Sequence, residues 1–409
     1  MTIAIVALLI GQTVALAALI VRLLPGRTRR PPVQPRSEIT DTTVSVIVAT
    51  LNEAERIGPC LAGLRAQGHP LLEVLVVDSR STDGTRELVE AAAALDPRVR
   101  LLTDDPLPEG WVGKVWALEH GVRAARAEWV LGIDADTEPN PGMVAGAVAA
   151  ARDSRYSMVS FAPTFTAQSA GEQFLQPALL LTLVYRGGVV GTDVSPKRLL
   201  ANGQCFLARS DTLIRHGGHH AARASFADDV TLARHLMREG ERVGFLDGSR
   251  LYRVRSYRSA GEMWREWGRS IDLKDATNLW QQRVDILFLV AVQGLPLLVL
   301  IALSVGGTPW THAPWRQLLA LVNAILLGIR VLLLGPLSQS YERPSVTFWF
   351  SWLADPLAVL RVAMSTLQRR RSWRGRTYPA AFLSSTATVA GLSGDLGQSA
   401  ASPRKRHNS

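Results

Sequence analysis

Two carboxylates separated by one residue, Asp134 and Asp136, follow the apolar run EWVLGI. In an extended turn, side chains two positions apart point to the same side. Carboxylate oxygens suit hard cations, and Mg²⁺ is usually held by one or two carboxylates together with substrate phosphates. The same D-x-D spacing is common in solvated turns, so the neighbouring segments decide whether it predicts a metal site.

Polar residues also follow two earlier apolar runs. VSVIVAT ends at Thr50 and is followed by Asn52 and Glu53, and LEVLVV is followed by Asp78. Asn is a favoured helix N-cap, so capping is the simple interpretation of the first group. The Asp78 carboxylate could accept the imide N–H of a uracil ring. Each of these polar groups alone would not predict a ligand site. Three of them, each at the end of a predicted strand, together do.

Further chemistry is available at Asp228 and Asp229, which begin a predicted amphipathic helix to about Glu239. Acidic residues favour helix N-termini, so compensation of the helix dipole is one interpretation. The other is general base catalysis, in which the carboxylate takes the proton of an attacking hydroxyl. Lys114 precedes another predicted helix, where it could meet a diphosphate or remain solvated.

The elements that must position these residues alternate between strand and helix from Thr43 onward. VSVIVAT, LEVLVV, VRLL and EWVLGI each have the composition of a buried strand, with helical segments between them. Such repeats predict an α/β fold with a Rossmann-like parallel or mixed sheet, helices on both faces, and ligands at the carboxyl ends of the strands. The polar motifs all lie at those ends.

An uncharged run from Thr2 to Val21 is long enough to cross a hydrocarbon layer of about 30 Å as a helix. It lacks a basic segment before it, and four arginines come directly after it, which disfavours a cleaved signal peptide. The same arginines predict that the chain beyond this helix lies in the cytoplasm. They are Arg22, Arg27, Arg29 and Arg30.

Two more apolar runs, Ile286–Val305 and Leu318–Leu337, predict a spanning hairpin near the C-terminus. A third run, Val346–Leu367, contains Asp355 and Arg361, which are costly in lipid, so an interfacial or re-entrant segment is favoured over a span. The Ser/Ala/Gly-rich tail after Leu383 has a disordered composition.

The net charge of +10 would also suit a nucleic-acid binder. The arginines cluster beside the apolar runs, however, and the pattern of a recognition helix is absent from the sequence, so a membrane protein without a nucleic-acid partner is predicted. Cys60 and Cys205 lack zinc-site spacing and are expected to be reduced packing residues.

The motifs at the strand ends resemble those of family-2 glycosyltransferases with the GT-A fold, over about Thr43 to Lys274. The resemblance implies that Asp136 binds Mg²⁺ or Mn²⁺, and that Asp229 is the catalytic base with Asp228 beside it. It also implies a set of residues that bind the nucleotide sugar: Thr50, Asn52, Glu53, Asp78, Lys114 and Asp134. Two positions depart from the family pattern, since Ser79 replaces a second aspartate and Asp228 replaces a glutamate.

The overall pattern is most similar to bacterial carotenoid glycosyltransferases, and nearly as similar to hopanoid-associated ones. This implies inverting, metal-dependent transfer from a nucleotide-diphosphate sugar, with a UDP-sugar expected first, to a hydroxyl of a lipid-like acceptor at the plasma membrane. Polyprenyl-phosphate and ceramide acceptors stay open, as does a catalytically silent membrane-binding module. The expected acceptor-side residues are His219, Arg223, Trp264, Arg265 and Trp267.

These interpretations divide the chain into successive segments. We expect a transmembrane anchor, a linker, a nucleotide-sugar half and an acceptor half of the GT-A domain, an interfacial helix, a transmembrane hairpin, a third apolar segment and a basic, then disordered tail. In that order they cover residues 1–24, 25–42, 43–150, 151–258, 259–284, 285–338, 345–367 and 368–409.

Overall fold

The computed structural model describes residues 2–255, 257, 259–270, 273–305, 314–367, 372–373 and 376–378. The chain forms two units, Met1–Arg369 and Arg370–Ser409. In the second unit, β11 (Ser372–Trp373) and β12 (Arg376–Thr377) pair antiparallel. The predicted disordered tail lies outside the described residues. The other described helices and strands belong to the first unit.

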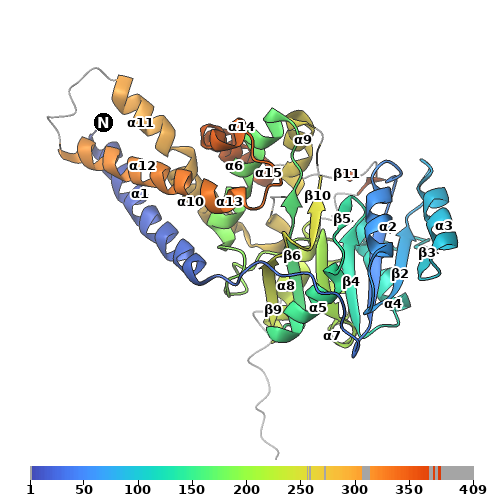
Figure 1. Ribbon diagram of the computed structural model, residues 1–409. Helices are drawn as coiled ribbons and strands as arrows, with labels where there is room; N and C mark the ends of the chain where they lie inside the picture. Colours follow the sequence, from blue (N-terminus) through green and yellow to red (C-terminus); the bar gives the residue numbers. More distant parts are fainter. Residues whose placement is uncertain are drawn as a thin grey trace, which may run out of the picture. The chain divides into compact units, whose positions relative to one another are not determined.

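A seven-stranded mixed sheet forms the centre of the first unit (Figure 1). Neighbouring strands are parallel except at β8, which runs antiparallel to both β4 and β6. The predicted α/β class is therefore confirmed, with a mixed rather than an all-parallel sheet. The strand order is β3 (Val99–Thr103), β2 (Leu71–Asp78), β1 (Val44–Thr50), β4 (Trp129–Asp134), β8 (Cys205–Arg209), β6 (Met158–Ala162) and β9 (Val243–Asp247).

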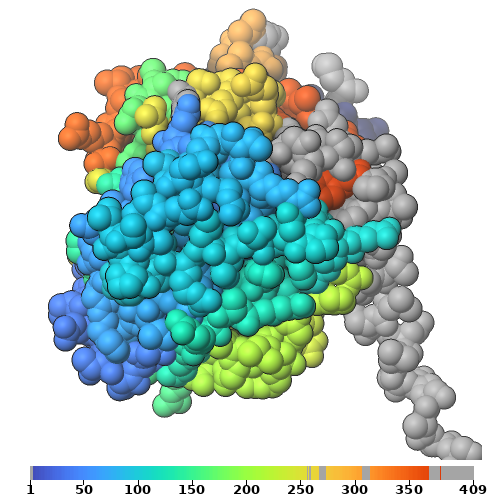
Figure 2. All heavy atoms as spheres, turned by 90° about the vertical axis from the view of Figure 1, so that its right-hand side faces the viewer, coloured from blue at the N-terminus to red at the C-terminus, as the bar shows by residue number. Residues whose placement is uncertain are grey.

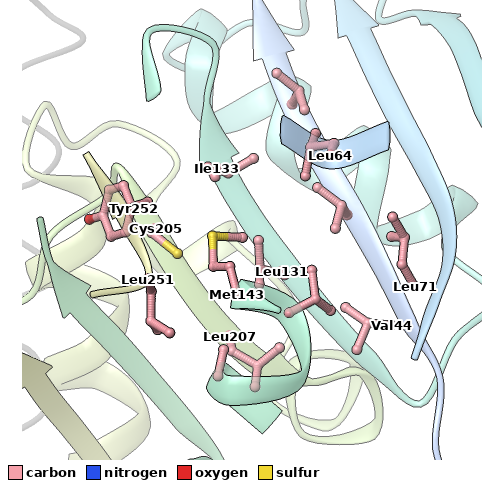
Figure 3. Close-up of a cluster of buried hydrophobic side chains, with 14 of the residues drawn as sticks. Val44, Leu64, Leu71, Leu131, Ile133, Met143, Cys205, Leu207, Leu251 and Tyr252 are labelled. Carbon is pink, nitrogen blue, oxygen red and sulfur yellow. The ribbon is translucent and has the colours of Figure 1, made fainter. Parts of the chain in front are cut away.

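The central strands are continuous runs of Val, Ile and Leu, which must be buried on both sides. Helices therefore cover both faces of this sheet. One face packs against α2 (Ile57–Arg65), α3 (Thr85–Leu95) and α5 (Met143–Asp153). Figure 3 shows part of this core, where Met143 lies beside Leu131 and Leu207. The other face packs against α4 (Gly113–Ala124), whose Gly121 lies directly against Ile47.

The edge of the sheet at β3 faces the viewer in Figure 2, where side chains of the first part of the chain, coloured blue to teal, cover most of this side. A second, three-stranded sheet follows the order β5 (Thr137–Pro139), β10 (Tyr252–Val254) and β7 (Thr164–Phe165). Residues 151–258 also contain α7 (Ser210–Arg215), η2 (His220–Ala222) and α8 (Asp228–Arg238).

Two helices are long and apolar enough to cross a membrane, Ile3–Thr28 and Pro314–Ser338. The first contains α1 (Thr2–Leu23) and η1 (Leu24–Thr28), and the second contains α12 (Pro314–Leu332) and α13 (Leu334–Ser338). Gln12 and Asn323 join α1 to α12 by two reciprocal amide hydrogen bonds of 2.8 Å. This pairing gives two buried side-chain amides the hydrogen-bond partners that lipid chains could not provide.

The first half of the predicted C-terminal hairpin is bent by 47° between Leu279–Gly294 and Pro296–Val305, so it forms a broken span or a re-entrant loop. The bend follows the π-helical turn η4 (Val290–Gly294) and includes Pro296, which has no backbone N–H to donate. The flanking helices are α10 (Leu279–Leu289) and α11 (Pro296–Val305).

The third apolar run is divided into α14 (Val346–Trp349), η5 (Ser351–Ala354) and α15 (Asp355–Leu367). These short elements pack against α6 (Ala170–Gly187), which begins with a capping box formed by Ser169 and Glu172. Helix α9 (Ala260–Ser270), followed by η3 (Lys274–Ala276), packs against α15. The run that carries Asp355 and Arg361 is thus not one continuous helix.

A buried ion pair connects α12 to α15. The guanidinium Nε of Arg330 lies 2.8 Å from Asp355 Oδ2, and both side chains are almost completely buried. Gln293 donates a further hydrogen bond of 3.1 Å to Asp355. The pair therefore holds α12 against α15, the last described helix of the unit.

We expect Arg330→Met to lower the free energy of unfolding by about 3–5 kcal/mol, because it leaves the Asp355 carboxylate buried without its cation. The double variant Arg330→Met/Asp355→Leu should recover most of this loss. Denaturant unfolding in detergent micelles measures both effects, with Arg316→Met, at the start of the same helix, as the control. If the single and double variants were equally unstable, loss of packing rather than an uncompensated charge would explain the cost.

Candidate functional site

The ends of β1 and β2 lie side by side, since Thr50 and Asp78 are register partners in the parallel ladder. The Asp78 carboxylate is completely buried, and it accepts hydrogen bonds from the Thr50 hydroxyl (3.3 Å), the Ser81 N–H (3.1 Å) and the Arg86 guanidinium (3.2 Å). These donors stabilise a carboxylate that burial alone would disfavour. The carboxylate is thereby fixed at the carboxyl edge of the sheet.

Asn52 joins the loops that follow β1 and β2. Its backbone, with a φ of 56°, places the N–H 2.8 Å from Ser81 Oγ, while its side-chain oxygen accepts from the Thr82 N–H at 2.9 Å. The N-cap of α2 is Arg56, so Asn52 does not cap that helix. Glu53 is buried nearby and donates its N–H to Thr85 Oγ1 at 2.9 Å. Residues 52 and 53 thus join the loop after β1 to the loop after β2.

Lys114 lies in the first turn of α4, and its Nζ is 2.6 Å from Asp134 Oδ1 at the end of β4. Burial lowers the pKa of the Lys114 ammonium, but nearby carboxylates raise that pKa by more. Those carboxylates belong to Asp134, Asp228 and Asp229. Lys114 is therefore a permanent cation at the place where the D-x-D turn and the start of α8 meet.

The two oxygens of the Asp229 carboxylate accept different backbone N–H groups. Oδ2 accepts from Gly203 at 2.7 Å, and Oδ1 accepts from Val230 at 2.8 Å. A Cβ at Gly203 would lie 3.3 Å from the Asp229 Cβ, so glycine permits this close approach. The side chain is consequently held in one orientation by the loop before β8 and by α8 itself.

Burial, together with the adjacent charge of Asp228, raises the pKa of Asp229 to about 7. Hydrogen bonds from Val230 and Gly203 and the charge of Lys114 act in the opposite direction. Burial also raises the pKa of Asp228, against the opposing charges of Lys114 and His219. A carboxyl group with a pKa near neutrality is well suited to take up and release protons.

Asp136 occupies the turn between β4 and β5, two residues after Asp134. Both carboxylates lie close to the same buried thiol: burial, then the charges of Asp136 and Asp134, raises the pKa of Cys60 to about 12. Cys60 and Cys205 are free and buried, as expected for packing residues.

Whether these residues fit a divalent cation depends on the donor set. Within the described residues, no group of three or more His, Cys, Asp or Glu side chains could hold a metal by itself. A site of one or two carboxylates completed by the phosphates of a ligand is the usual arrangement for Mg²⁺, and Asp136 with the adjacent Asp134 provides it. The residues therefore fit a cation that arrives with a phosphorylated ligand.

A carboxylate that sequence reasoning missed lies beside Ser79. The Ser79 hydroxyl donates to Asp104 Oδ2 at 2.7 Å, and the Trp116 indole N–H donates to the Asp104 carbonyl at 2.6 Å. Asp104 follows β3 and is buried. The third strand thus supplies a carboxylate beside the position where the family pattern has its second aspartate. The Asp104–Asp105 pair after VRLLT was the available sequence signal.

Of the expected acceptor-side residues, His219 is an interior one, only 1% exposed. The backbone N–H of His219 donates to Glu119 Oε2 at 2.8 Å, and its imidazole ring packs edge to face against the Phe206 ring. The Arg223 carbonyl accepts the Val112 N–H at 2.7 Å, which joins the segment before α8 to the start of α4. Both residues therefore contribute to the packing around the site.

Trp264 and Arg265 belong to α9, and their backbone carbonyls accept hydrogen bonds from the Arg361 guanidinium of α15 at 2.6 and 3.2 Å. Arg361 also lies over the Trp264 ring, 5.7 Å from its centroid. Trp267 lies in the same helix, but its side chain is outside the described part of the structure. Helix α9 is thus anchored to α15 through its backbone.

Comparison with known proteins gives two overlapping family matches. The model described as "Glycosyl transferase family 2" matches residues 45–194, and that of "Glycosyl transferase family group 2" matches residues 129–338, which is half of the chain. The first match contains the polar ends of β1, β2 and β4, and the second contains Asp228 and Asp229.

Individual relatives are more distant. The succinoglycan biosynthesis protein ExoO of Rhizobium meliloti is 38% identical over 98 residues, 24% of this chain and 26% of that protein. The 4,4'-diaponeurosporenoate glycosyltransferase of Staphylococcus haemolyticus is 25% identical over 201 residues, 49% of this chain and 52% of that protein. The chain thus spans between about a quarter and a half of the length of these relatives.

Among solved structures, the mannosyltransferase PcManGT from Pyrobaculum calidifontis, in complex with GDP-Man and Mn²⁺, is 22% identical with a TM-score of 0.49. That comparison covers 89% of this chain and 99% of the other. With one family match extending over half of the chain and a second over the polar strand ends, the chain belongs to glycosyltransferase family 2.

Proposed function

We propose that this protein transfers a sugar, with inversion, from a nucleotide-diphosphate sugar to a hydroxyl of an acceptor dissolved in the membrane. The observation that carries the proposal is the position of Lys114, which contacts Asp134 and interacts with the carboxylates of Asp228 and Asp229. These interactions support one site that includes the D-x-D turn and the Asp228–Asp229 pair, as direct displacement at a single carbon requires.

In this mechanism each side chain has a separate task. Asp78 is assigned to the nucleobase, and its buried carboxylate would accept a hydrogen bond from the base once the Arg86 guanidinium moves away from it. Lys114 places a fixed positive charge beside the diphosphate. Asp136, with Asp134 adjacent, would hold a divalent cation, which when bound neutralises charge on the departing diphosphate. Asp229 removes the proton of the attacking hydroxyl from the side opposite the leaving group.

The proposed acceptor is lipid-like, and a carotenoid is the first to test. Support comes from the two apolar helices of the first unit, which are long enough to cross a membrane, and from the similarity to the 4,4'-diaponeurosporenoate glycosyltransferase. A catalytic domain held at the cytoplasmic face of the plasma membrane would meet such acceptors at high effective concentration. Polyprenyl phosphate, hopanoid and ceramide acceptors are the alternatives within the same reaction class.

The test is transfer of labelled sugar by the full chain in lipid nanodiscs that contain one acceptor at a time. UDP-linked and GDP-linked sugars should be compared as donors, each with Mg²⁺ and with Mn²⁺. We expect transfer to a hydroxylated carotenoid and, as inversion requires, a product of opposite anomeric configuration to the donor. Transfer to polyprenyl phosphate alone would reject the carotenoid acceptor, and no transfer to any acceptor would favour a catalytically silent module.

The pKa of about 7 at Asp229 predicts a pH dependence of transfer. The base is active as a carboxylate, so kcat/KM should fall about tenfold per unit as the pH drops below about 7. Asp228→Asn removes a charge that raises the pKa of Asp229, and it should move this acid limb to lower pH. Rate profiles between about pH 5.5 and 8.5 measure both. An acid limb at the same pH in both proteins would assign it to another group.

A further inference from the structure

His219 is a buried histidine of the segment between α7 and α8, and the transfer reaction proposed above gives it no task. Its side chain is 1% exposed. Neither ring nitrogen has a hydrogen-bond partner among the residues that the structure describes. A buried polar ring without partners costs free energy, so packing alone would be served better by an apolar side chain of similar size.

A carboxylate of α4 lies beside this imidazole. The His219 Nδ1 is 3.7 Å from Glu119 Oε2, and the same oxygen accepts the backbone N–H of His219 at 2.8 Å. The other carboxylate oxygen, Oε1, accepts from Arg123 at 2.8 Å. Burial raises the pKa of Glu119, but its contacts with His219 and Arg123 lower that pKa by more. The ring of His219 therefore faces an anion.

The turn before His219 brings the ring to this carboxylate. Gly217 and Gly218 have φ values of 76° and 62°, in the left-handed region that glycine adopts without strain. A Cβ at Gly218 would collide with the Glu119 carboxylate, so a larger residue would push that carboxylate away from His219. The backbone of this turn thus fixes the pairing of His219 with Glu119.

The charge of His219 also acts on the start of α8. Burial raises the pKa of Asp228, and the charges of Lys114 and then His219 oppose that rise. The charge of Asp134 adds to the rise. His219 therefore favours the ionised form of Asp228, together with the fixed cation of Lys114.

Other charged groups face these residues from the neighbouring elements. Arg234 of α8 interacts electrostatically with Asp229. His220 of η2 interacts with Arg223 and with Glu119. All of these groups stay in place when the buried imidazole is replaced, so a change in titration can be assigned to that ring.

The ionised form of Asp228 in turn acts on Asp229. After burial, the charge of Asp228 is the next cause that raises the pKa of Asp229 to about 7. If the charge of His219 were removed, Asp228 would hold a proton more readily and would repel the Asp229 carboxylate less. The pKa of Asp229 would then fall, so His219 raises that pKa indirectly.

We propose that His219, held in place by Glu119, is a positioning residue that acts through Asp228 to keep the base Asp229 ready to take up a proton near neutral pH. This inference rests on the transfer reaction proposed above, in which Asp229 removes the proton of the acceptor hydroxyl. It adds a residue that tunes the base through another side chain.

The experiment compares pH profiles of kcat/KM for the unmodified chain and for His219→Gln, which keeps a polar side chain of similar size but carries no charge. We expect the acid limb to move to lower pH by about half a unit, which makes the rate at about pH 5.5 about threefold higher relative to the plateau. Glu119→Gln removes the carboxylate that faces the imidazole and should move the limb in the same direction.

His216→Gln is the matched control. His216 lies in the same segment and also pairs with a carboxylate, since its Nε2 is 2.9 Å from Glu241 Oε1. Its variant should leave the acid limb in place. A purely structural role of His219 would lower the rate equally at every pH and would not move the limb.

The double variant Asp228→Asn/His219→Gln tests the indirect action. Because His219 acts through Asp228, its replacement should not move the acid limb further once Asp228 is neutral. A further shift in the double variant would overturn the proposal. So would an unmoved limb, or a limb moved to higher pH, in His219→Gln alone.

Infrared titration of the carboxyl band that Asp229→Asn removes follows the same protonation without relying on transfer. We expect the midpoint of this band to shift in His219→Gln as the acid limb does. If Asp228→Asn shifts the midpoint and His219→Gln does not, the role of His219 alone is rejected. If both variants shift it and no acceptor receives sugar, the transfer proposal fails while the action of His219 on Asp229 stands.

Discussion

Asp229→Asn is expected to lower the single-turnover rate of sugar transfer by about 10²–10⁴-fold, the usual contribution of a general base. The affinity for the nucleotide sugar should stay within about threefold, because the proposed role of Asp229 is toward the acceptor hydroxyl and not toward the donor. Asn retains the shape of Asp but cannot take up the proton. Rapid-quench transfer assays and equilibrium titration of the donor measure the two quantities on the same preparation.

The structure also predicts a side effect of this substitution. Both Asp229 oxygens accept backbone N–H groups, so the NH₂ of Asn must face either Gly203 or Val230, and one hydrogen bond is lost. A loss of about 1–3 kcal/mol in unfolding free energy is therefore expected and must be measured separately.

Asp211→Asn provides the matched control. Asp211 lies in the first turn of α7 and accepts the N–H of the following residue, Thr212, at 2.8 Å, as Asp229 does from Val230. It is exposed, so its variant should transfer sugar at the normal rate. If both variants kept near-normal transfer, Asp229 would serve only to stabilise the start of α8.

The sequence predicted the strand ends well because burial on both faces leaves a clear apolar run that stops at the first polar residue. The ends of β1, β2 and β4 and the start of α8 all lie where those runs and the acidic pair predicted them. The reversed direction of β8 was not predictable in the same way, because an apolar strand has the same composition in either direction.

Contacts between distant segments were the main part of the site that the sequence did not predict. Lys114 was expected to meet a diphosphate or solvent, and its contact with Asp134 depends on how α4 and β4 come together. Asp104 reaches Ser79 only because β3 pairs with β2. His219 was expected on the acceptor side, which stays a prediction, and the burial of its ring could not be predicted because a polar residue near an acidic pair has the same sequence pattern whether it is buried or exposed.

The second large effect is expected for Asp136→Ala, which removes the carboxylate best placed to hold a cation against the diphosphate. The metal-dependent part of donor affinity should fall at least about 100-fold, because a bridging divalent cation contributes several kcal/mol of charge stabilisation. Binding of the nucleoside through Asp78 should persist, so that affinity for a nucleoside without phosphates is unchanged.

Titration of Mn²⁺ by electron paramagnetic resonance, in the presence of a nucleoside diphosphate, measures cation capture without relying on activity. Glu138→Ala is the matched control, since Glu138 lies two residues further along the same turn and strand and pairs with Arg253 instead. Its variant should capture Mn²⁺ normally. Undiminished Mn²⁺ capture in Asp136→Ala would place the cation elsewhere. Asp134 would then be the carboxylate to test, because it is the other acidic side chain of the same turn and could bind a cation once released from Lys114.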